Sequence, residues 1–350
     1  MTAFDSADGL ALRRAVCAAP DDDLPRLVLA DYLDESGDAG DADRAAFIRA
    51  QCEMEGVPWM SQRWRKLNSS AATLLEKHRE VWPTTVARLG VMSPHWGRGF
   101  IESVQVFAKT FTAKSGRKLL DVEPVREVRL VHLAKPGGLG VAEFVADPVV
   151  GRLRGLDFGS TGFAYRDIEA VAAAGQATLA GLEALRLNQM TRDDLVRGLP
   201  LLLRSLPRLS TLGTSASGYG DDRSLAQAVT EVSQDPVFAR LAHLDIIRAG
   251  VARAAIALAR SPHLGGLKRL RLSYGEVTRA GVAALAGAAL TALEILDLSD
   301  NRTLTEAHVR SPAGAAFVPT LKVLVVRRCG LAKANGQRFA GLFPHAEVVV

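Results

Sequence analysis

The sequence predicts an α/β fold: a solenoid of about ten parallel strands backed by helices, preceded by a small all-helical domain. An apolar frame recurs from about residue 100 to the C-terminus, with a strand and a helix in each copy. The first 82 residues instead show helical spacing. The composition agrees, because 48% of the residues are hydrophobic and only 6% are aromatic, which is typical of cores built from aliphatic layers.

The clearest repeat is a pair of copies 26 residues apart. Each copy has apolar residues at its first, fourth, seventh and ninth positions. Between the copies, Thr278 can cap a helix whose apolar residues follow helical spacing. A unit of this size cannot bury its own apolar face, so it needs a similar unit on each side. The apolar residues of the two copies are Leu264, Leu267, Leu270 and Leu272, then Leu290, Leu293, Leu296 and Leu298.

Other copies cover the rest of this region. One more copy is required between Leu182 and Leu241, and two registers fit it. One passes through Leu203, Leu206 and Leu209, the other through Leu206, Leu209 and Leu212; we favour the second because it gives more even spacing. The remaining copies begin at Ile101, Val122, Val150, Leu179, Phe238, Val318 and Phe343, the first and last being incomplete.

This pattern resembles the leucine-rich-repeat family, and the long helical half of each copy is similar to the ribonuclease-inhibitor class. Asn301, and more loosely Asn188, match the asparagine that follows the strand in that family. The resemblance implies a concave face made of strands and a convex face made of helices.

The N-terminal region predicts helices over residues 7–19 and 24–33, a third helix starting at Arg44, and a fourth that runs towards Trp82. Asp23 is the expected N-cap of the second helix, and Gly37 follows its end. Residues 83–99 are rich in proline and glycine and predict a hinge, with Trp96 covering the end of the first solenoid layer. The predicted domains are therefore 1–82, the hinge 83–99, and 100–350.

A second resemblance covers about residues 8–55, where the run PDDDLPRLVLADYLDESGD is followed by RAAFIRAQ. It is similar to the repeat-companion domain that precedes leucine-rich repeats in certain bacterial proteins. That family implies no catalytic role. Tyr32 stands where the family more often has tryptophan. The matching residues are Pro25 to Val28, Ala30, Asp31, Leu33, Glu35, Gly37, Asp38, Phe47 to Arg49 and Gln51.

Cysteine usage and hydropathy predict a cytoplasmic protein. Cys17, Cys52 and Cys329 are odd in number and far apart, without a C-x-x-C pair. The acidic N-terminal residues do not resemble a signal peptide. No apolar run approaches the roughly 20 residues that are needed to cross a bilayer. Charge is uneven: the net is −6 over residues 1–50 and +11 over residues 51–350. We therefore expect no membrane contact, while the basic C-terminal repeats leave nucleic-acid binding open as an alternative.

Motifs of catalysis and cofactor binding are absent from the sequence. The loop from Asp34 lacks the glycine and glutamate of a calcium-binding EF-hand. The glycines at positions 137, 138 and 140 have Glu143 where a nucleotide-binding loop needs its third glycine. We expect no enzyme activity, metal or cofactor. One alternative is an enzyme, or its substrate-recognition subunit, with Cys17 or Cys52 as a reactive thiol near His78.

The concave face offers the predicted binding site. Side chains alternate along a strand, so the residue between the last two apolar positions points away from the core. Charges of opposite sign alternate along this row and can pair between neighbouring strands. Each such exposed ion pair would contribute about 0.2–1 kcal/mol to stability. The row is Arg129, Asp157, Arg186, a position near Gly213, Asp245, Arg271, Asp297 and Val325.

A second row lies two residues earlier and turns apolar towards the C-terminus. An apolar patch at Ile295, Val323 and Val325 would suit a protein segment that carries acidic groups, because basic residues surround it. This basic rim consists of Lys268, Arg269, Arg271, Arg327 and Arg328. We predict a non-enzymatic protein-binding scaffold; ordinary exposure and a dimer contact are the other interpretations of the patch. The second row is Glu127, Gly155, Ala184, Arg208, His243, Arg269, Ile295 and Val323.

Overall fold

The computed structural model describes residues 2–131, 133, 139–159, 163–188, 190–215, 222–247, 251–331, 338–339 and 341–350. The chain forms two compact units, Met1–Asp157 (unit 1) and Phe158–Val350 (unit 2). The fold is α/β, and its described strands are parallel except for β1, which pairs with β2 antiparallel. The predicted limits at residues 82 and 99 both lie inside unit 1 and stay predictions.

Unit 1 begins with helices that match the predicted ones, with differences at their starts. The third helix begins at Ala39 and not at Arg44, because the Asp38 side chain accepts hydrogen bonds from the first backbone N–H groups. Asp23 precedes α2 but makes no capping bond, since its carboxylate pairs with Arg98. The bounds are η1 Ala3–Asp5, α1 Ala7–Ala18, α2 Leu24–Asp34, α3 Ala39–Glu55, α4 Gln62–Lys77 and α5 Thr84–Ala87.

The strands of unit 1 follow these helices. β1 was not predicted, because its three residues lie in the proline- and glycine-rich segment and carry no apolar frame. Gly99 at the β1–β2 turn has φ +84°, and a Cβ there would lie 2.3 Å from Cγ1 of Ile48, so only glycine fits. The bounds are β1 His95–Gly97, β2 Phe100–Phe107, α6 Ala108–Thr112, α7 Lys114–Val122, β3 Glu127–Val131, α8 Val141–Ala146, η2 Pro148–Arg152 and β4 Gly155–Asp157.

A buried charge cluster joins α2 to the β1–β2 hairpin. The Arg26 side chain is fully buried and donates to Oε1 of Glu102 at 2.8 Å. Arg98 donates to the same oxygen, also at 2.8 Å. Burial lowers the pKa of Arg26, and the Glu102 carboxylate is the strongest influence in the opposite direction. One carboxylate therefore holds two buried guanidinium groups.

The residues that carry the second sequence resemblance have structural roles in unit 1. Gln51 accepts from the Gly99 N–H at 2.8 Å, and Arg49 pairs with Asp31 and Asp34. Trp96, expected to cap the first layer, has its ring centroid 5.6 Å from that of Phe47 and belongs to an aromatic group around the buried Arg44. Residues of the motif thus link α2 to α3 and α3 to the β1–β2 hairpin.

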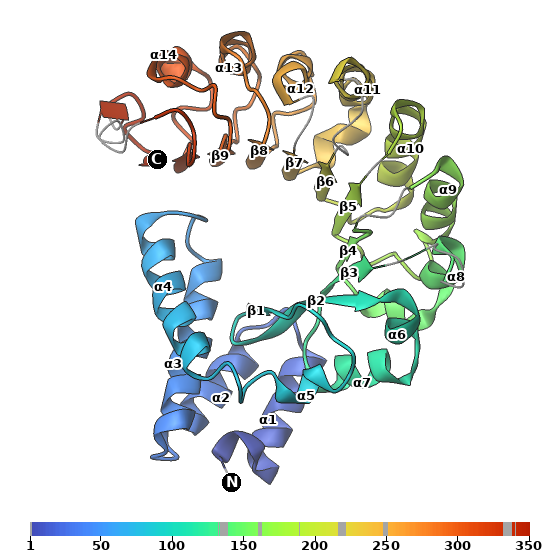
Figure 1. Cartoon of the computed structure of the whole chain (residues 1–350), viewed down its shortest axis with the longest axis vertical. Helices are drawn as coiled ribbons and strands as arrows, with labels where there is room; N and C mark the ends of the chain where they lie inside the picture. Colours follow the sequence, from blue (N-terminus) through green and yellow to red (C-terminus); the bar gives the residue numbers. More distant parts are fainter. Residues whose placement is uncertain are drawn as a thin grey trace. The chain divides into compact units, whose positions relative to one another are not determined.

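Unit 2 alternates strands and helices in chain order, and Figure 1 shows its strands on the inner side and its helices on the outer side. The described strands β2–β11 match the ten predicted copies of the frame. The bounds are α9 Tyr165–Ala174, β5 Ala184–Asn188, α10 Arg192–Ser205, β6 Thr211–Ser215, α11 Asp222–Ser233, η3 Pro236–Arg240, β7 His243–Ile247, α12 Val251–Ala259, β8 Arg269–Ser273, α13 Arg279–Ala286, β9 Ile295–Asp297, α14 Glu306–Arg310, η4 Ser311–Gly314, β10 Val323–Val325 and β11 Glu347–Val349.

The strand register places the predicted leucines in one stacked layer. Leu185, Leu212 and Leu244 are direct register partners and each is at most 2% exposed. The register through Leu212 is therefore confirmed over the alternative that ends at Leu209. Complete burial of each such side chain contributes about 1.5–3 kcal/mol before the entropy of folding is subtracted.

Asn301 lies just after β9 and is fully buried. Its Nδ2 donates to the carbonyl oxygens of Leu272 and Leu298, each at 2.8 Å, and its Oδ1 accepts from the Val277 N–H at 3.2 Å. The side chain thereby satisfies backbone groups of two neighbouring repeats that strand pairing leaves without partners. Within the described residues, no helix is both long and apolar enough to cross a membrane.

Candidate functional site

The first predicted row lies on register partners. Within unit 1, Arg129 pairs with Asp157 across β3 and β4. In unit 2, Asp245, Arg271 and Asp297 occupy matching positions on β7, β8 and β9. The row therefore exists as predicted on these strands, on the face opposite the helices; in unit 2 we call this the inner face.

Opposite charges along the row form ion pairs. Nε of Arg129 is 2.8 Å from Oδ2 of Asp157, and Nε of Arg271 is 3.2 Å from Oδ2 of Asp297. The predicted pairing is confirmed for these two pairs, but the prediction of exposed pairs is wrong for the carboxylates, since Asp157 is 2% and Asp297 1% exposed. A short aspartate lies between long side chains on strands about 5 Å away and is covered by them.

Asp245 is also buried, at 7% exposure, and lies 3.9 Å from Nε of Arg269. Asp297 is more completely bonded, because its Oδ1 also accepts from the Ser299 N–H at 2.9 Å. Asp297 thus holds Arg271 in place, whereas Asp245 lies within ion-pairing distance of Arg269 without a hydrogen bond from its Nε; both carboxylates are shielded from a partner.

The second row differs from the prediction at one position. Thr211, and not Arg208, is the register partner of His243. Nδ1 of His243 lies 3.2 Å from Oγ1 of Thr211, and burial together with Arg269 lowers the pKa of the imidazole. At neutral pH this position therefore presents an uncharged polar group.

The predicted apolar patch is largely buried. Val323 is fully buried and Val325 is 1% exposed, so the prediction of an exposed patch is wrong for both. Their strand lies between β9 and β11, whose side chains cover small residues from two sides. Ile295 alone of the three is partly exposed.

The basic rim divides into engaged and available groups. Arg269 and Arg271 lie beside buried carboxylates, whereas Arg327 is exposed. Arg186 on β5 is partly exposed, and its side chain packs across Gly213, where a Cβ would come within 2.9 Å of it. The partly accessible side chains on the inner face of unit 2 include Arg186, Thr211, His243, Arg269, Arg271 and Ile295.

Of three residues just beyond the strands, the sequence analysis missed Tyr274 and Asp300 and named Arg328 only as part of the basic rim. Tyr274, Asp300 and Arg328 have φ of 57°, 60° and 52°, a left-handed conformation that is rare for non-glycine residues. Each follows the last apolar residue of its frame by two positions, and extending the frame would have found them. Tyrosine and arginine, however, give no sign of a left-handed backbone.

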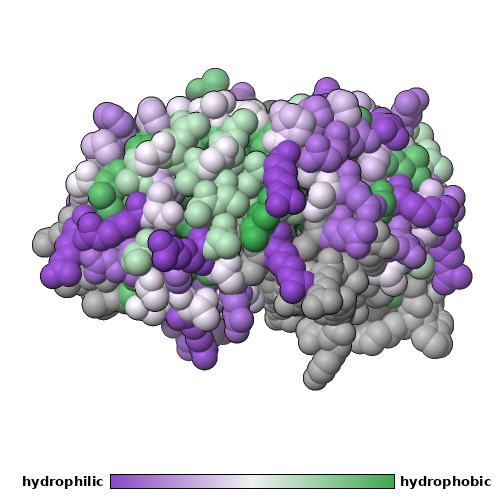
Figure 2. All heavy atoms as spheres, turned by 90° about the horizontal axis from the view of Figure 1, so that it is seen from above, coloured by the Kyte–Doolittle hydropathy of each residue, from purple (hydrophilic) through white to green (hydrophobic). Residues whose placement is uncertain are grey.

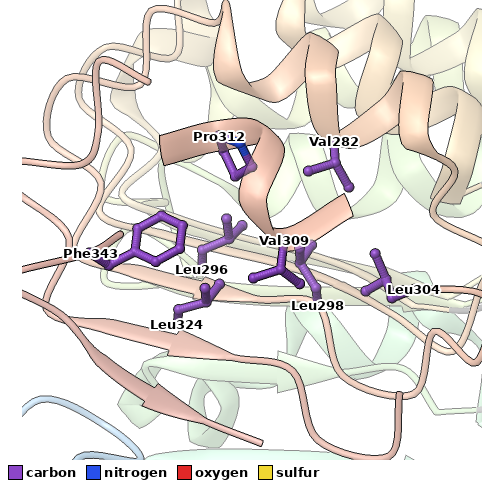
Figure 3. A pocket seen from close by; sticks show the side chains of 8 residues that line it. All are labelled: Val282, Leu296, Leu298, Leu304, Val309, Pro312, Leu324 and Phe343. Atoms are coloured by element: carbon purple, nitrogen blue, oxygen red, sulfur yellow. The ribbon is translucent and has the colours of Figure 1, made fainter. Parts of the chain in front are cut away.

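A small cavity lies in the core of unit 2, between the sheet and the helices α13 and α14 (Figure 3). Its volume is about 10 Å³, and every lining side chain is apolar. A space of that size holds at most one water molecule, which would find no polar partner there. The cavity is a packing defect and not a ligand site. Its lining residues are Val282, Leu296, Leu298, Leu304, Val309, Pro312, Leu324 and Phe343.

In the view from above that Figure 2 gives, weakly apolar atoms form a connected pale-green area that is bordered by hydrophilic atoms. On α13 the exposed residues include Arg279, Ala280 and Ala283. Small side chains such as Ala280 and Ala283 contribute little contact area to binding. Positions on this helix are therefore suitable for control substitutions.

The acidic residues around the end of α2 have structural roles. Asp34 pairs with Arg49, and Asp38 caps α3. Among the described residues, no group of three or more His, Cys, Asp or Glu side chains could hold a metal ion. The glycines at positions 137 and 138 lie outside the described residues.

We expect the thiols to react slowly in the native protein. Burial raises the pKa of Cys17 to about 11 and of Cys52 to about 12. At pH 8 only about one thousandth of Cys17 is then thiolate, the reactive form. Iodoacetamide labelling followed by mass spectrometry should be far slower natively than in urea. Native labelling of either thiol within about tenfold of the rate in urea would contradict the burial argument.

Neither the models of protein families nor the curated proteins contain a match to this chain.

Proposed function

We propose that the chain is a leucine-rich-repeat protein of the ribonuclease-inhibitor-like class, preceded by a repeat-companion helical module. The apolar frame whose two clearest copies lie 26 residues apart supports this proposal, as does the in-register stacking of Leu270 on Leu296. Asn301 supports it further, because its side chain bonds to the backbone of two successive repeats. The three free cysteines suit a reducing compartment, and we propose the cytoplasm.

The proposed function is non-enzymatic binding of a protein partner on the inner face of unit 2. The observation that carries it is the Arg271–Asp297 ion pair, which anchors the arginine to a buried carboxylate. Side chains that are already fixed lose little entropy on binding, so the face is preorganised for recognition.

The accessible chemistry of this face suits a protein better than the alternatives. The partly accessible side chains Arg186, Thr211, His243, Arg269, Arg271 and Ile295 combine cations with neutral polar and apolar groups. The buried Asp245 and Asp297 offset the charges of Arg269 and Arg271, whereas a nucleic-acid backbone favours a row of uncompensated cations. The raised pKa values of Cys17 and Cys52 argue against an enzyme built on a reactive thiol.

Site-specific crosslinking tests this function. A photoreactive phenylalanine analogue at Ile295 on the inner face should crosslink to a partner protein in the cells that make this chain. The matched control is the same analogue at Ala283, which is exposed on the outer helix α13. We expect a discrete crosslinked band from position 295 and none from position 283.

A second variant separates binding from folding. Ile295→Arg adds bulk and charge to the inner face without touching the buried aspartates, and it should weaken binding of the crosslinked partner at least tenfold. Reversing Arg271 to glutamate is a poor test, because it would place a carboxylate against the buried Asp297. Equal crosslinking from both positions, or unchanged binding by Ile295→Arg, would refute the proposed function.

A further inference from the structure

The strongest unexplained feature of unit 2 is the cluster formed by Tyr274, Asp300 and Arg328. These residues follow β8, β9 and β10 at the same position of successive repeats. The Tyr274 N–H donates to the Ser299 carbonyl at 3.4 Å, and the Asp300 N–H donates to the Arg327 carbonyl at 2.9 Å. Strand-like pairing thus extends past the strands and aligns the three side chains.

The backbone of all three residues is left-handed, a conformation that L side chains adopt with difficulty and glycine adopts freely. A repeat that needed only a turn at this position could use glycine. Three successive repeats instead keep a tyrosine, an aspartate and an arginine there. Backbone strain held at a common position is a feature of binding and catalytic sites, which motivates a functional interpretation.

The cluster is preorganised by its own contacts. Arg328 binds Asp300 through two bonds, with Nε 2.8 Å from Oδ1 and Nη2 2.9 Å from Oδ2. Nη2 of Arg328 also lies 3.3 Å from the Tyr274 hydroxyl, and its guanidinium carbon is 5.9 Å from the centroid of the tyrosine ring. The tyrosine is therefore held in one orientation while remaining 49% exposed.

Tyr274 is the one large apolar side chain of unit 2 that is strongly exposed among the residues described. Arg302 follows Asp300 by two residues and Arg327 directly precedes Arg328; both are exposed, and among the described residues neither forms an ion pair with a carboxylate. Asp300 is already engaged by Arg328. This edge is therefore an anchored aromatic ring with a surplus of positive charge.

We propose that Tyr274, Arg327 and Arg328 form a docking edge that binds an acidic, extended segment of a partner protein. A carboxylate of that segment accepts from the Arg327 guanidinium, and an apolar group packs on the free face of Tyr274. Tyrosine and arginine are the side chains that most often dominate binding energy at interfaces. The inference rests on the proposed function, because it assigns the acidic part of the partner to this edge.

A phage-displayed library of random twelve-residue peptides provides the probe. Peptides selected on the wild-type protein should be enriched in Asp and Glu. Their affinity should fall about 30-fold or more with Tyr274→Ala and roughly tenfold with Arg327→Glu. Tyr274→Phe keeps the ring and should retain most of the affinity. Ala283→Arg, on the outer face, is the matched control and should change nothing.

Tyr274→Gly separates binding from stability. It relieves the left-handed strain, so its thermal midpoint should equal or exceed that of the wild type, while its affinity should fall as in Tyr274→Ala. A lower midpoint together with wild-type affinity would show that Tyr274 serves the fold alone and would overturn the docking edge.

The remaining outcomes each decide the proposal. Selected peptides that lack acidic residues, or no selected peptides at all, overturn it. If the peptides still bind the Tyr274→Ala and Arg327→Glu variants but do not bind Ile295→Arg, the docking edge is refuted and the inner face remains as the binding surface. A random-sequence twelve-nucleotide DNA that displaces the peptides with a steep salt dependence would assign the edge to nucleic acid instead.

Discussion

Replacing Glu102 by alanine should destabilise unit 1 by about 3–5 kcal/mol. Oε1 of this side chain accepts from Arg26 and from Arg98, each at 2.8 Å, and the two arginines are 0% and 5% exposed. Without the carboxylate, two buried cations face each other with mainly backbone carbonyls as partners, including the Pro20 oxygen. The loss should appear in urea unfolding followed by tryptophan fluorescence, since Trp96 lies in the adjacent strand β1.

Two variants define the origin of that loss. Glu102→Gln keeps an acceptor oxygen but removes the charge, so its effect should lie between those of the wild type and Glu102→Ala. Glu76→Ala is the matched control, because the Arg79–Glu76 pair spans 2.8 Å with side chains 63% and 71% exposed. A pair so exposed to water should contribute about 0–1 kcal/mol. If Glu102→Ala lost no more than Glu76→Ala, the buried cluster would not stabilise unit 1.

Replacing Asn301 by alanine should destabilise unit 2 by about 3 kcal/mol or more, because several buried backbone groups lose their partners at once. These groups include the Leu272 carbonyl oxygen and the Val277 N–H, while the Leu298 carbonyl keeps only the weak donor Sγ of Cys329. Hydrogen exchange provides a local measurement: the Val277 amide should exchange much faster in the variant than in the wild type.

A second substitution at this position keeps the shape of the asparagine side chain and removes its N–H donors. Asn301→Asp is nearly isosteric but places a carboxylate against carbonyl oxygens, so it should be at least as harmful as alanine. Thr303→Ala, on an exposed residue of the same loop, should change the free energy of unfolding by about 0.5 kcal/mol or less. An Asn301→Asp variant as stable as the wild type would contradict the bonding described for this side chain.

The strands were predictable because the frame is aliphatic and periodic. Leu212 and Leu244 lie where even spacing put them, since a register shift of one residue would turn every leucine away from the core. The pairing of Arg271 with Asp297 was predictable for the same reason: alternation along the strand and register between strands together fix which side chains are neighbours.

Burial on the inner face was not predictable from alternation. The period of two assigns Asp297 and Val325 to a face, but the exposure of each depends on the size of the side chains on both adjacent strands. The start of α3 was missed for a different reason. Asp38 caps a segment of low apolar content, Ala39 to Asp43, so the hydrophobic pattern begins one turn after the helix does.

The alternation of charge along the inner face restricts how this protein can change length. Strands β7, β8 and β9 carry Asp245, Arg271 and Asp297 as successive neighbours. Excision of the one unit that contains β8 would keep every leucine in phase, yet it would bring two buried carboxylates together. In this part of the chain, duplication of two adjacent units keeps opposite charges on neighbouring strands, and duplication of one unit does not.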